Sequence, residues 1–211
     1  MRKFFGTAMT LSLGFCLFTV SPLFAKNGSV LITRVQGSAQ IMRDQKAMPA
    51  KEGMAVQQGD ILKTGPDCTL DISMNDLVGG RMLPGSECEI DKTKPKSMKL
   101  KITNGNTILN LERLPEGSEF KIETPTAVAA ARGTQFWGRV DAQNVDNPVT
   151  TFAVREGAVQ ILAKGAGKYF MLNPGQALDI PKQGTAAPIV RAALEEEMAA
   201  MQQASSIKTS A

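Results

Sequence analysis

Strict alternation of apolar and polar residues is the feature of this chain that most limits its fold. In the clearest run, Cys68, Leu70, Ile72 and Met74 share one parity, and polar residues separate them. Shorter runs with the same period lie at residues 98–102, 120–123, 152–154 and 178–180. A period of two is typical of strands that bury one face. The chain is therefore predicted to consist mainly of half-buried β-strands.

Glycine, proline, aspartate and asparagine interrupt these runs at short intervals. The interruptions are Gly65-Pro66-Asp67, Gly79-Gly80, Pro84-Gly85, Asn104-Gly105, Pro115-Glu116-Gly117, Asp146-Asn147-Pro148 and Pro174-Gly175. Many short strands joined by tight turns are typical of an all-β sandwich, barrel or solenoid.

An internal echo narrows that choice. VQGSAQI at residues 35–41 reads closely like REGAVQI at residues 155–161, and NGNTI at residues 104–108 is a weaker copy. Such copies suggest that the chain winds and forms the same local structure more than once. Their central glycines are 68 and 52 residues apart (105 minus 37 and 157 minus 105), which is too irregular for a repeat array. We expect a wound sandwich with solenoid-like character, punctuated by glycine and proline.

The first 25 residues have the layout of a secretory signal peptide. Basic Arg2 and Lys3 precede an apolar run from Ala8 to Val20, and Leu23-Phe24-Ala25 offers a cleavage site after Ala25. The apolar run is shorter than the roughly 20 residues that span a bilayer. We expect export to the periplasm or beyond, with no membrane span after cleavage; a retained N-terminal anchor is the alternative.

The remaining chain is divided into a β-domain, a helix and a tail. The β-domain is predicted at residues 26–182. Val190, Leu194, Met198 and Met201 lie at helical spacing and predict an amphipathic helix over residues 188–204, followed by a disordered tail at 205–211. The helix either packs on the β-domain or binds a partner.

Cys68 and Cys88 are the two cysteines that remain after signal cleavage. Both lie on the apolar parity of a strand, and an oxidising compartment favours disulfides, so we expect them to pair. Two buried reduced thiols are the alternative. Without residues 1–25, 22 basic residues stand against 20 acidic ones, a balance that does not favour nucleic-acid binding.

No catalytic or metal-binding constellation is visible in the sequence. The chain contains no histidine, so serine or cysteine nucleophiles lack their usual base. The Asx-rich segment that starts at Asp141 fails the EF-hand pattern, because Asp146 stands where glycine is required and Phe152 where the bidentate glutamate should be. We expect a binding protein without cofactor or metal, and no enzyme.

Four motifs resemble the FecR family. They are GDILKTG at residues 59–65, TPTAVAAARGTQF at 124–136, REGAV at 155–159 and LNPGQ at 172–176. The resemblance covers roughly residues 30–180 and implies a non-enzymatic extracytoplasmic β-domain. Similar regulators of iron uptake relay a receptor's state to a cytoplasmic sigma factor. We do not expect that role here, because the chain lacks their cytoplasmic segment and their additional receptor-contacting domain.

The residues that match the family motifs are expected to serve mainly the fold. They are Gly59, Asp60, Thr64, Gly65, Thr124, Pro125, Arg132, Gly133, Thr134, Phe136, Gly157 and Gly175. Arg132 follows an apolar run, so we expect its guanidinium to be partly buried and paired with Asp60. An anion-binding Arg132 is the alternative.

Two features are candidates for contact with a partner. The basic residues Lys92, Lys94, Lys96, Lys99 and Lys101 could dock a polyanion such as lipopolysaccharide or peptidoglycan, or could simply form a solvated face. Trp137 faces away from Phe136, so it either points outward, where it could stack on sugars, or lies under the C-terminal helix or a loop. The sequence thus predicts a scaffold or signalling module that binds an envelope protein; the alternative is a cell-wall or carbohydrate binder.

Overall fold

The structure, a computed structural model, describes residues 29–142, 146–182 and 186–207. In these residues seventeen strands form one continuous hydrogen-bonded network, and a short helix follows near the C-terminus. The predicted all-β fold with one C-terminal helix is confirmed. The predicted signal peptide, residues 1–25, lies outside the described residues.

The network folds into two sheets that share one strand. In spatial order, sheet A consists of β4 (Ala55–Val56), β1 (Val30–Gln36), β6 (Thr69–Met74), β7 (Val78–Met82), β9 (Ser97–Leu111), β12 (Gln135–Asp141), β13 (Val149–Glu156), β16 (Gln176–Pro181) and β17 (Ile189–Ala192). Sheet B consists of β3 (Lys46–Pro49), β2 (Ala39–Arg43), β5 (Ile61–Thr64), β8 (Glu87–Lys94), β9, β10 (Glu119–Glu123), β11 (Ala127–Ala131), β14 (Val159–Ala163) and β15 (Lys168–Leu172).

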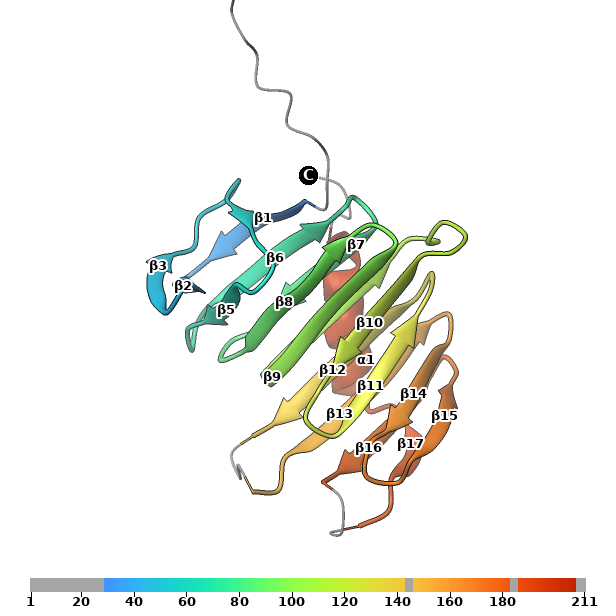
Figure 1. The fold of residues 1–211 in the computed structure, drawn as a ribbon. Coiled ribbons are helices and arrows are strands. Elements are labelled where there is room, and N and C mark those ends of the chain that lie inside the picture. The colour runs from blue at the N-terminus through green and yellow to red at the C-terminus, as the bar shows by residue number, and fades with distance from the viewer. Residues whose placement is uncertain (1–28, 143–145, 183–185, 208–211) are drawn as a thin grey trace, which may run out of the picture.

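The chain winds from one end of this sandwich to the other. Figure 1 shows β1 to β3 at one end and β14 to β17 at the opposite end, with β9 between them. The apolar parity of both sheets faces inward, and Phe120, Phe136 and Phe152 are fully buried in the core. Burying a side chain of this size stabilises the fold by roughly 1.5–3 kcal/mol. The expected wound sandwich is the observed architecture.

The internal echo marks corners where the chain crosses between the sheets. Gly37 lies between β1 and β2, Gly157 between β13 and β14, and Gly105 inside β9, all with positive φ. Each glycine lies close to the backbone of another segment of the chain. A Cβ on Gly157 would be 2.6 Å from the Gly133 carbonyl oxygen, and a Cβ on Gly105 would be 2.5 Å from the Cα of Ser86. Glycine recurs because the corners need a left-handed residue and close backbone approach.

The C-terminal helix begins later than predicted. Residues 189–192 form β17, which pairs with β16, and helix α1 runs over Glu195–Gln203. The predicted start at residue 188 was wrong because the β-branched Ile189 and Val190 satisfy their backbone by extending sheet A. A short 3-10 helix, Ala204–Ser206, and the buried Ile207 follow. The predicted disordered tail was therefore wrong at its start, and residues 208–211 lie outside the described range.

Helix α1 packs on the outer face of sheet A. Packing on the β-domain is the first of the two alternatives that the sequence left open for this helix. Its Met201 joins Ala204 and Ile207 over a strip of sheet side chains. That strip is Ile108, Trp137, Ala153 and Ala177. Sheet A is therefore buried on both faces at its centre, whereas α1 leaves sheet B uncovered (Figure 1).

The crowded corners give a stability test with an internal control. Gly157→Ala adds a methyl group to a position with positive φ and no room, whereas Gly175→Ala adds it at a similar φ with nothing within 4 Å. The control should cost about 1–2 kcal/mol from backbone strain alone, and Gly157→Ala about 1–3 kcal/mol more from overpacking. Urea denaturation of the two variants measures the difference. Equal losses would show that the corner has room to relax.

Candidate interaction surface

The N-terminal end of the sandwich has protected sheet edges. The edge of sheet A is β4, which has only two residues, and the edge of sheet B is β3, which begins at Lys46 and ends at Pro49. Short strands, lysine and proline are devices that prevent an edge from pairing with another chain. This end is therefore a poor surface for strand addition.

The C-terminal end has edge strands without proline and exposes large apolar side chains. Its edges are β15 in sheet B and β17 in sheet A, and β15 pairs only with β14 among the described strands. Tyr169 is 68% exposed and Met171 56% on β15, and Ile189 is 60% exposed on β17. We call this region, formed by β15, β17 and the space between them, the open end. Exposed edges with large apolar side chains are typical of interaction sites.

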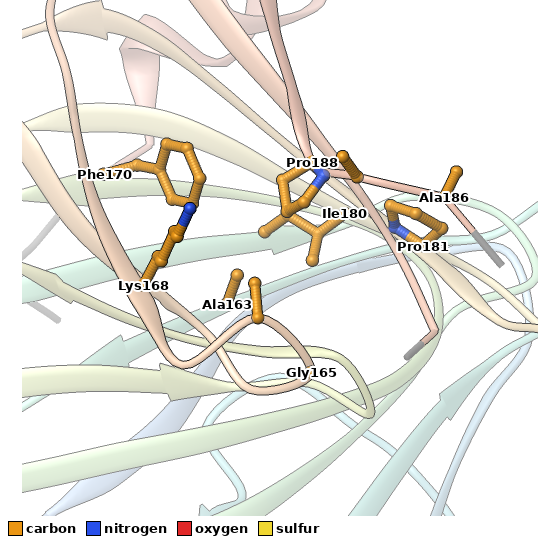
Figure 2. A pocket seen from close by; sticks show the side chains of 10 residues that line it. Ala163, Gly165, Lys168, Phe170, Ile180, Pro181, Ala186 and Pro188 are labelled. Atoms are coloured by element: carbon orange, nitrogen blue, oxygen red, sulfur yellow. The ribbon is translucent and has the colours of Figure 1, made fainter. Parts of the chain in front are cut away.

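A pocket of about 330 Å³ lies at this end, between β15 on one side and Ile180, Pro181 and residues 186–188 on the other. Figure 2 shows Phe170 and Lys168 of β15 on one wall, facing Ile180 and Pro188 across the cavity. Apolar residues dominate the lining, and the Lys168 ammonium is the charged group in it. The pocket offers room for an apolar side chain with a positive charge close by.

The apolar character continues from β15 over the outer face of sheet B. In the strand register Tyr169 lies beside Leu162, which lies beside Val128, and Met171 lies beside Gln160, which lies beside Ala130. We call Val128, Ala130, Leu162, Tyr169 and Met171 the β15 face. Sequence reasoning missed it, although the unbroken run Tyr169-Phe170-Met171-Leu172 departs from the alternation found elsewhere.

The other half of the same face carries ion pairs. Lys99 pairs with Asp91 at 3.0 Å and also with Glu123, and Lys101 pairs with Glu89 at 3.1 Å. Alternation correctly placed both lysines outward, but the facing carboxylates neutralise their charges. Of the predicted basic surface, Lys92, Lys94 and Lys96 are exposed at the turn between β8 and β9.

Trp137 is covered and cannot stack on a sugar. It is 7% exposed and lies in the cluster beneath α1, which is the second of the two predicted alternatives. Polar contacts also hold the helix there. Arg191 of β17 pairs with Glu197 at 2.6 Å and with Asp179 at 2.7 Å, and the Gln135 amide donates to the Met201 carbonyl at 3.0 Å. The hydrogen bonds that Arg191 donates to Glu197 and Asp179 raise the pKa of its guanidinium.

The predicted pair between Asp60 and Arg132 was wrong. Asp60, 2% exposed, accepts two hydrogen bonds from Arg43, at 2.8 and 2.6 Å, and one from the Gln57 N–H at 2.7 Å. Burial alone would raise the pKa of Asp60, but the Arg43 and Gln57 hydrogen bonds outweigh it and lower that pKa. Arg132 is exposed and donates to the Leu114 carbonyl instead.

The remaining motif residues occupy turns and the core. Thr64 donates to the Leu83 carbonyl and accepts from the Ser86 N–H, which ties two corners together. Thr124 accepts from the Thr150 hydroxyl at 2.9 Å in the turn that contains Pro125. Gly59, Gly65, Gly133, Thr134, Gly157 and Gly175 lie in turns beside the strands, and Phe136 lies in the core.

The structure does not contain the predicted disulfide. Cys68 and Cys88 are free and buried, which is the alternative that the sequence left open. Burial raises the pKa of Cys68, and it raises the pKa of Cys88 to about 12, so neither thiol is set up as a nucleophile. Parity predicted that both thiols point inward but not how far apart their strands lie.

The part of the chain that the structure describes comprises residues 29–142, 146–182 and 186–207. Within it, no group of three or more acidic, cysteine or histidine side chains is placed to hold a metal ion. None of its helices has the length and apolar content to cross a membrane.

Comparison with known proteins confirms the FecR resemblance. The family model described as FecR protein matches residues 60–160. Two crystal structures of a "putative anti-sigma factor" from Parabacteroides distasonis ATCC 8503 share the fold, each with a TM-score of 0.57 at 14% identity. The match covers 68% of this chain and 64% of the other, so this chain spans less than two thirds of that protein. None of the curated proteins compared matches the chain.

The corrected ion pair predicts unequal effects of two substitutions. Asp60→Asn removes the buried carboxylate that pairs with Arg43. Because the Arg43 charge then has no partner there, the substitution should lower the free energy of unfolding by about 3 kcal/mol. Arg132→Met removes hydrogen bonds from an exposed side chain and should cost about 1 kcal/mol. Urea denaturation distinguishes them. A larger loss for Arg132→Met would contradict the assignment.

The ion pairs on sheet B predict a pH dependence. Hydrogen bonds from Lys99 and Lys164 lower the pKa of Glu123 from 4.5 to about 2. A carboxyl group whose pKa is lower in the folded state than in the unfolded state stabilises the fold at pH values above its ordinary pKa. That contribution is lost as the pH falls from about 4.5 toward 2. The parent chain should lose about 1 kcal/mol more than Glu123→Gln over this window. Chemical denaturation at several pH values measures it, and parallel curves would exclude the effect.

Proposed function

We propose that this chain, whose residues 60–160 form a FecR domain, is an exported, non-enzymatic signalling or scaffold module that binds an envelope protein through its open end. The observation that carries the proposal is the contrast between the two ends of the sandwich. One end is protected by Lys46, Pro49 and a two-residue edge, whereas the other exposes Tyr169, Met171 and Ile189.

A regulatory role is supported by the comparisons and by two features of the residues. The chain has no histidine, and its buried thiols have raised pKa values. A solved structure that shares the fold is described as a "putative anti-sigma factor". Export is supported by the charged, apolar and small-residue segments of residues 1–25.

The open end also has the chemistry of a protein contact. Large apolar side chains with polar groups around them dominate the centres of protein interfaces. The pocket beside β15 could receive one apolar side chain, and Lys168 favours an acidic neighbour. Trp137, the only tryptophan, is covered, so it offers no aromatic face to a sugar.

A cell-wall polymer is the second candidate, favoured by one observation. Lys92, Lys94 and Lys96 are exposed together at the turn between β8 and β9, so an anionic polymer could bind there. Such binding would weaken strongly with salt.

Pull-down from an envelope extract tests the proposal. Ile189→Lys places a charge on exposed β17 and should reduce recovery of the partner at least tenfold, which corresponds to about 1.4 kcal/mol. Ala47→Lys adds the same charge to exposed β3 at the protected end and should leave recovery unchanged.

A sedimentation assay with isolated peptidoglycan tests the alternative. We expect no cosedimentation once protease has stripped the wall of proteins. Sedimentation that survives protease and is lost in the combined variant Lys92→Glu, Lys94→Glu, Lys96→Glu would overturn the protein-partner proposal in favour of the polymer.

A further inference from the structure

The edge strand β15 has the sequence Lys-Tyr-Phe-Met-Leu and, unlike β3, contains no proline. Tyr169 and Met171 project from the outer face, with 68% and 56% of their surface exposed, while Phe170 and Leu172 point toward the core. Because β15 pairs with β14 on one side only among the described strands, its other side presents backbone groups for a further strand.

The geometry points to a second copy of this chain as the occupant of that edge, with β15 of each copy paired antiparallel about a two-fold axis through Phe170. This inference rests on the proposed function only in that both use the open end. A two-fold interface brings the same patch together twice, so it must be self-complementary.

The antiparallel register satisfies that condition. Centring the pair on Phe170 places Tyr169 opposite Met171 of the other copy, and it does so twice. A methionine sulfur against an aromatic ring is a favourable contact. Each pair also joins the two β15 faces, because Tyr169 lies beside Leu162 within its own sheet. The apolar surface would thus continue from one copy into the next.

Charge separates the antiparallel arrangement from the parallel one. In the antiparallel register Lys168 lies opposite Leu172, so the two Lys168 residues are about 14 Å apart along the strands, at about 3.4 Å per residue. That distance exceeds the Debye length at physiological salt, about 8 Å. An in-register parallel pair would place the two ammonium groups on adjacent strands about 4.8 Å apart.

The protected end closes the assembly at two copies. If β15 could also pair with β3 of another copy, the contact would be heterologous and would generate an open filament. Lys46 and Pro49 at β3 oppose that pairing. The chain therefore presents one pairing edge in sheet B, and a contact through it ends with a dimer.

Light scattering after size-exclusion chromatography of the signal-free chain tests the pairing and its register. The parent should have twice the monomer mass. The double variant Tyr169→Lys, Met171→Lys places like charges opposite each other and should be monomeric. The double variant Tyr169→Lys, Met171→Glu places opposite charges across the axis and should recover the dimer. Ala47→Lys on β3 is the control and should stay dimeric.

Several results would overturn the inference. A parent chain that stays monomeric at all concentrations, or a dimer that persists in the Tyr169→Lys, Met171→Lys variant, would exclude β15 pairing. A monomeric Tyr169→Lys, Met171→Glu variant with an unchanged melting temperature would exclude this register. In the dimer, the variant Phe170→Cys should form a disulfide across the two-fold axis. Cys68 and Cys88 are buried, so a disulfide-linked dimer can be assigned to the new cysteine.

The two proposals fail in distinguishable ways. A monomeric parent whose envelope partner is still lost in Ile189→Lys overturns the dimer and leaves the proposed function standing. A dimer disrupted only at β15, with no partner sensitive to Ile189→Lys, supports the dimer and counts against the proposed function.

Discussion

Strand β9 is the element on which the rest of the structure depends. Its first half pairs with β8 and β10 in sheet B, and its second half pairs with β7 and β12 in sheet A. The crossing at Gly105 is possible because this residue has a positive φ and because it lacks a side chain, which would collide with Ser86. Both sheets therefore grow outward from one shared strand, and a single core runs through them.

This arrangement has a direct consequence for function, because a sandwich built outward from its middle has two ends. Each end carries the edge of both sheets, and edges must be blocked or occupied. The N-terminal half finishes in two short or proline-containing strands. The C-terminal half finishes in β15 and β17, whose exposed tyrosine, methionine and isoleucine are costly unless they contact something. The difference between the ends makes the open end a specific surface.

Much of the fold could be predicted from local pattern, whereas the contacts that cross the sandwich could not. Alternation located the strands, and the echo located the corners, because both depend on neighbouring residues. The partner of Asp60 depends on which strand lies beside β5, and that is β2 with Arg43, not the turn that holds Arg132. Helical spacing at residues 190–201 was misleading because Ile189 and Val190 could also extend a sheet. The exposure of Tyr169 follows only from β15 being last in its sheet.

Helix α1 shows that this chain can bury an apolar strip on the outer face of a sheet by packing its own helix over it. On sheet A, Trp137 and Ile108 are covered by Met201 and Ile207, with Arg191 and Glu197 fixing the start of the helix. On sheet B no described element covers the β15 face. We infer that another molecule covers the β15 face, as α1 covers the apolar strip of sheet A.

Hydrogen–deuterium exchange, followed at low and high protein concentration, is the most direct measurement of whether the open end is a contact surface. We predict that the amides of residues 168–172 become slower to exchange as the concentration rises, while those of residues 46–49 at the protected end do not change. Uniform exchange at β15 across the concentration range, or new protection at β3, would contradict the account.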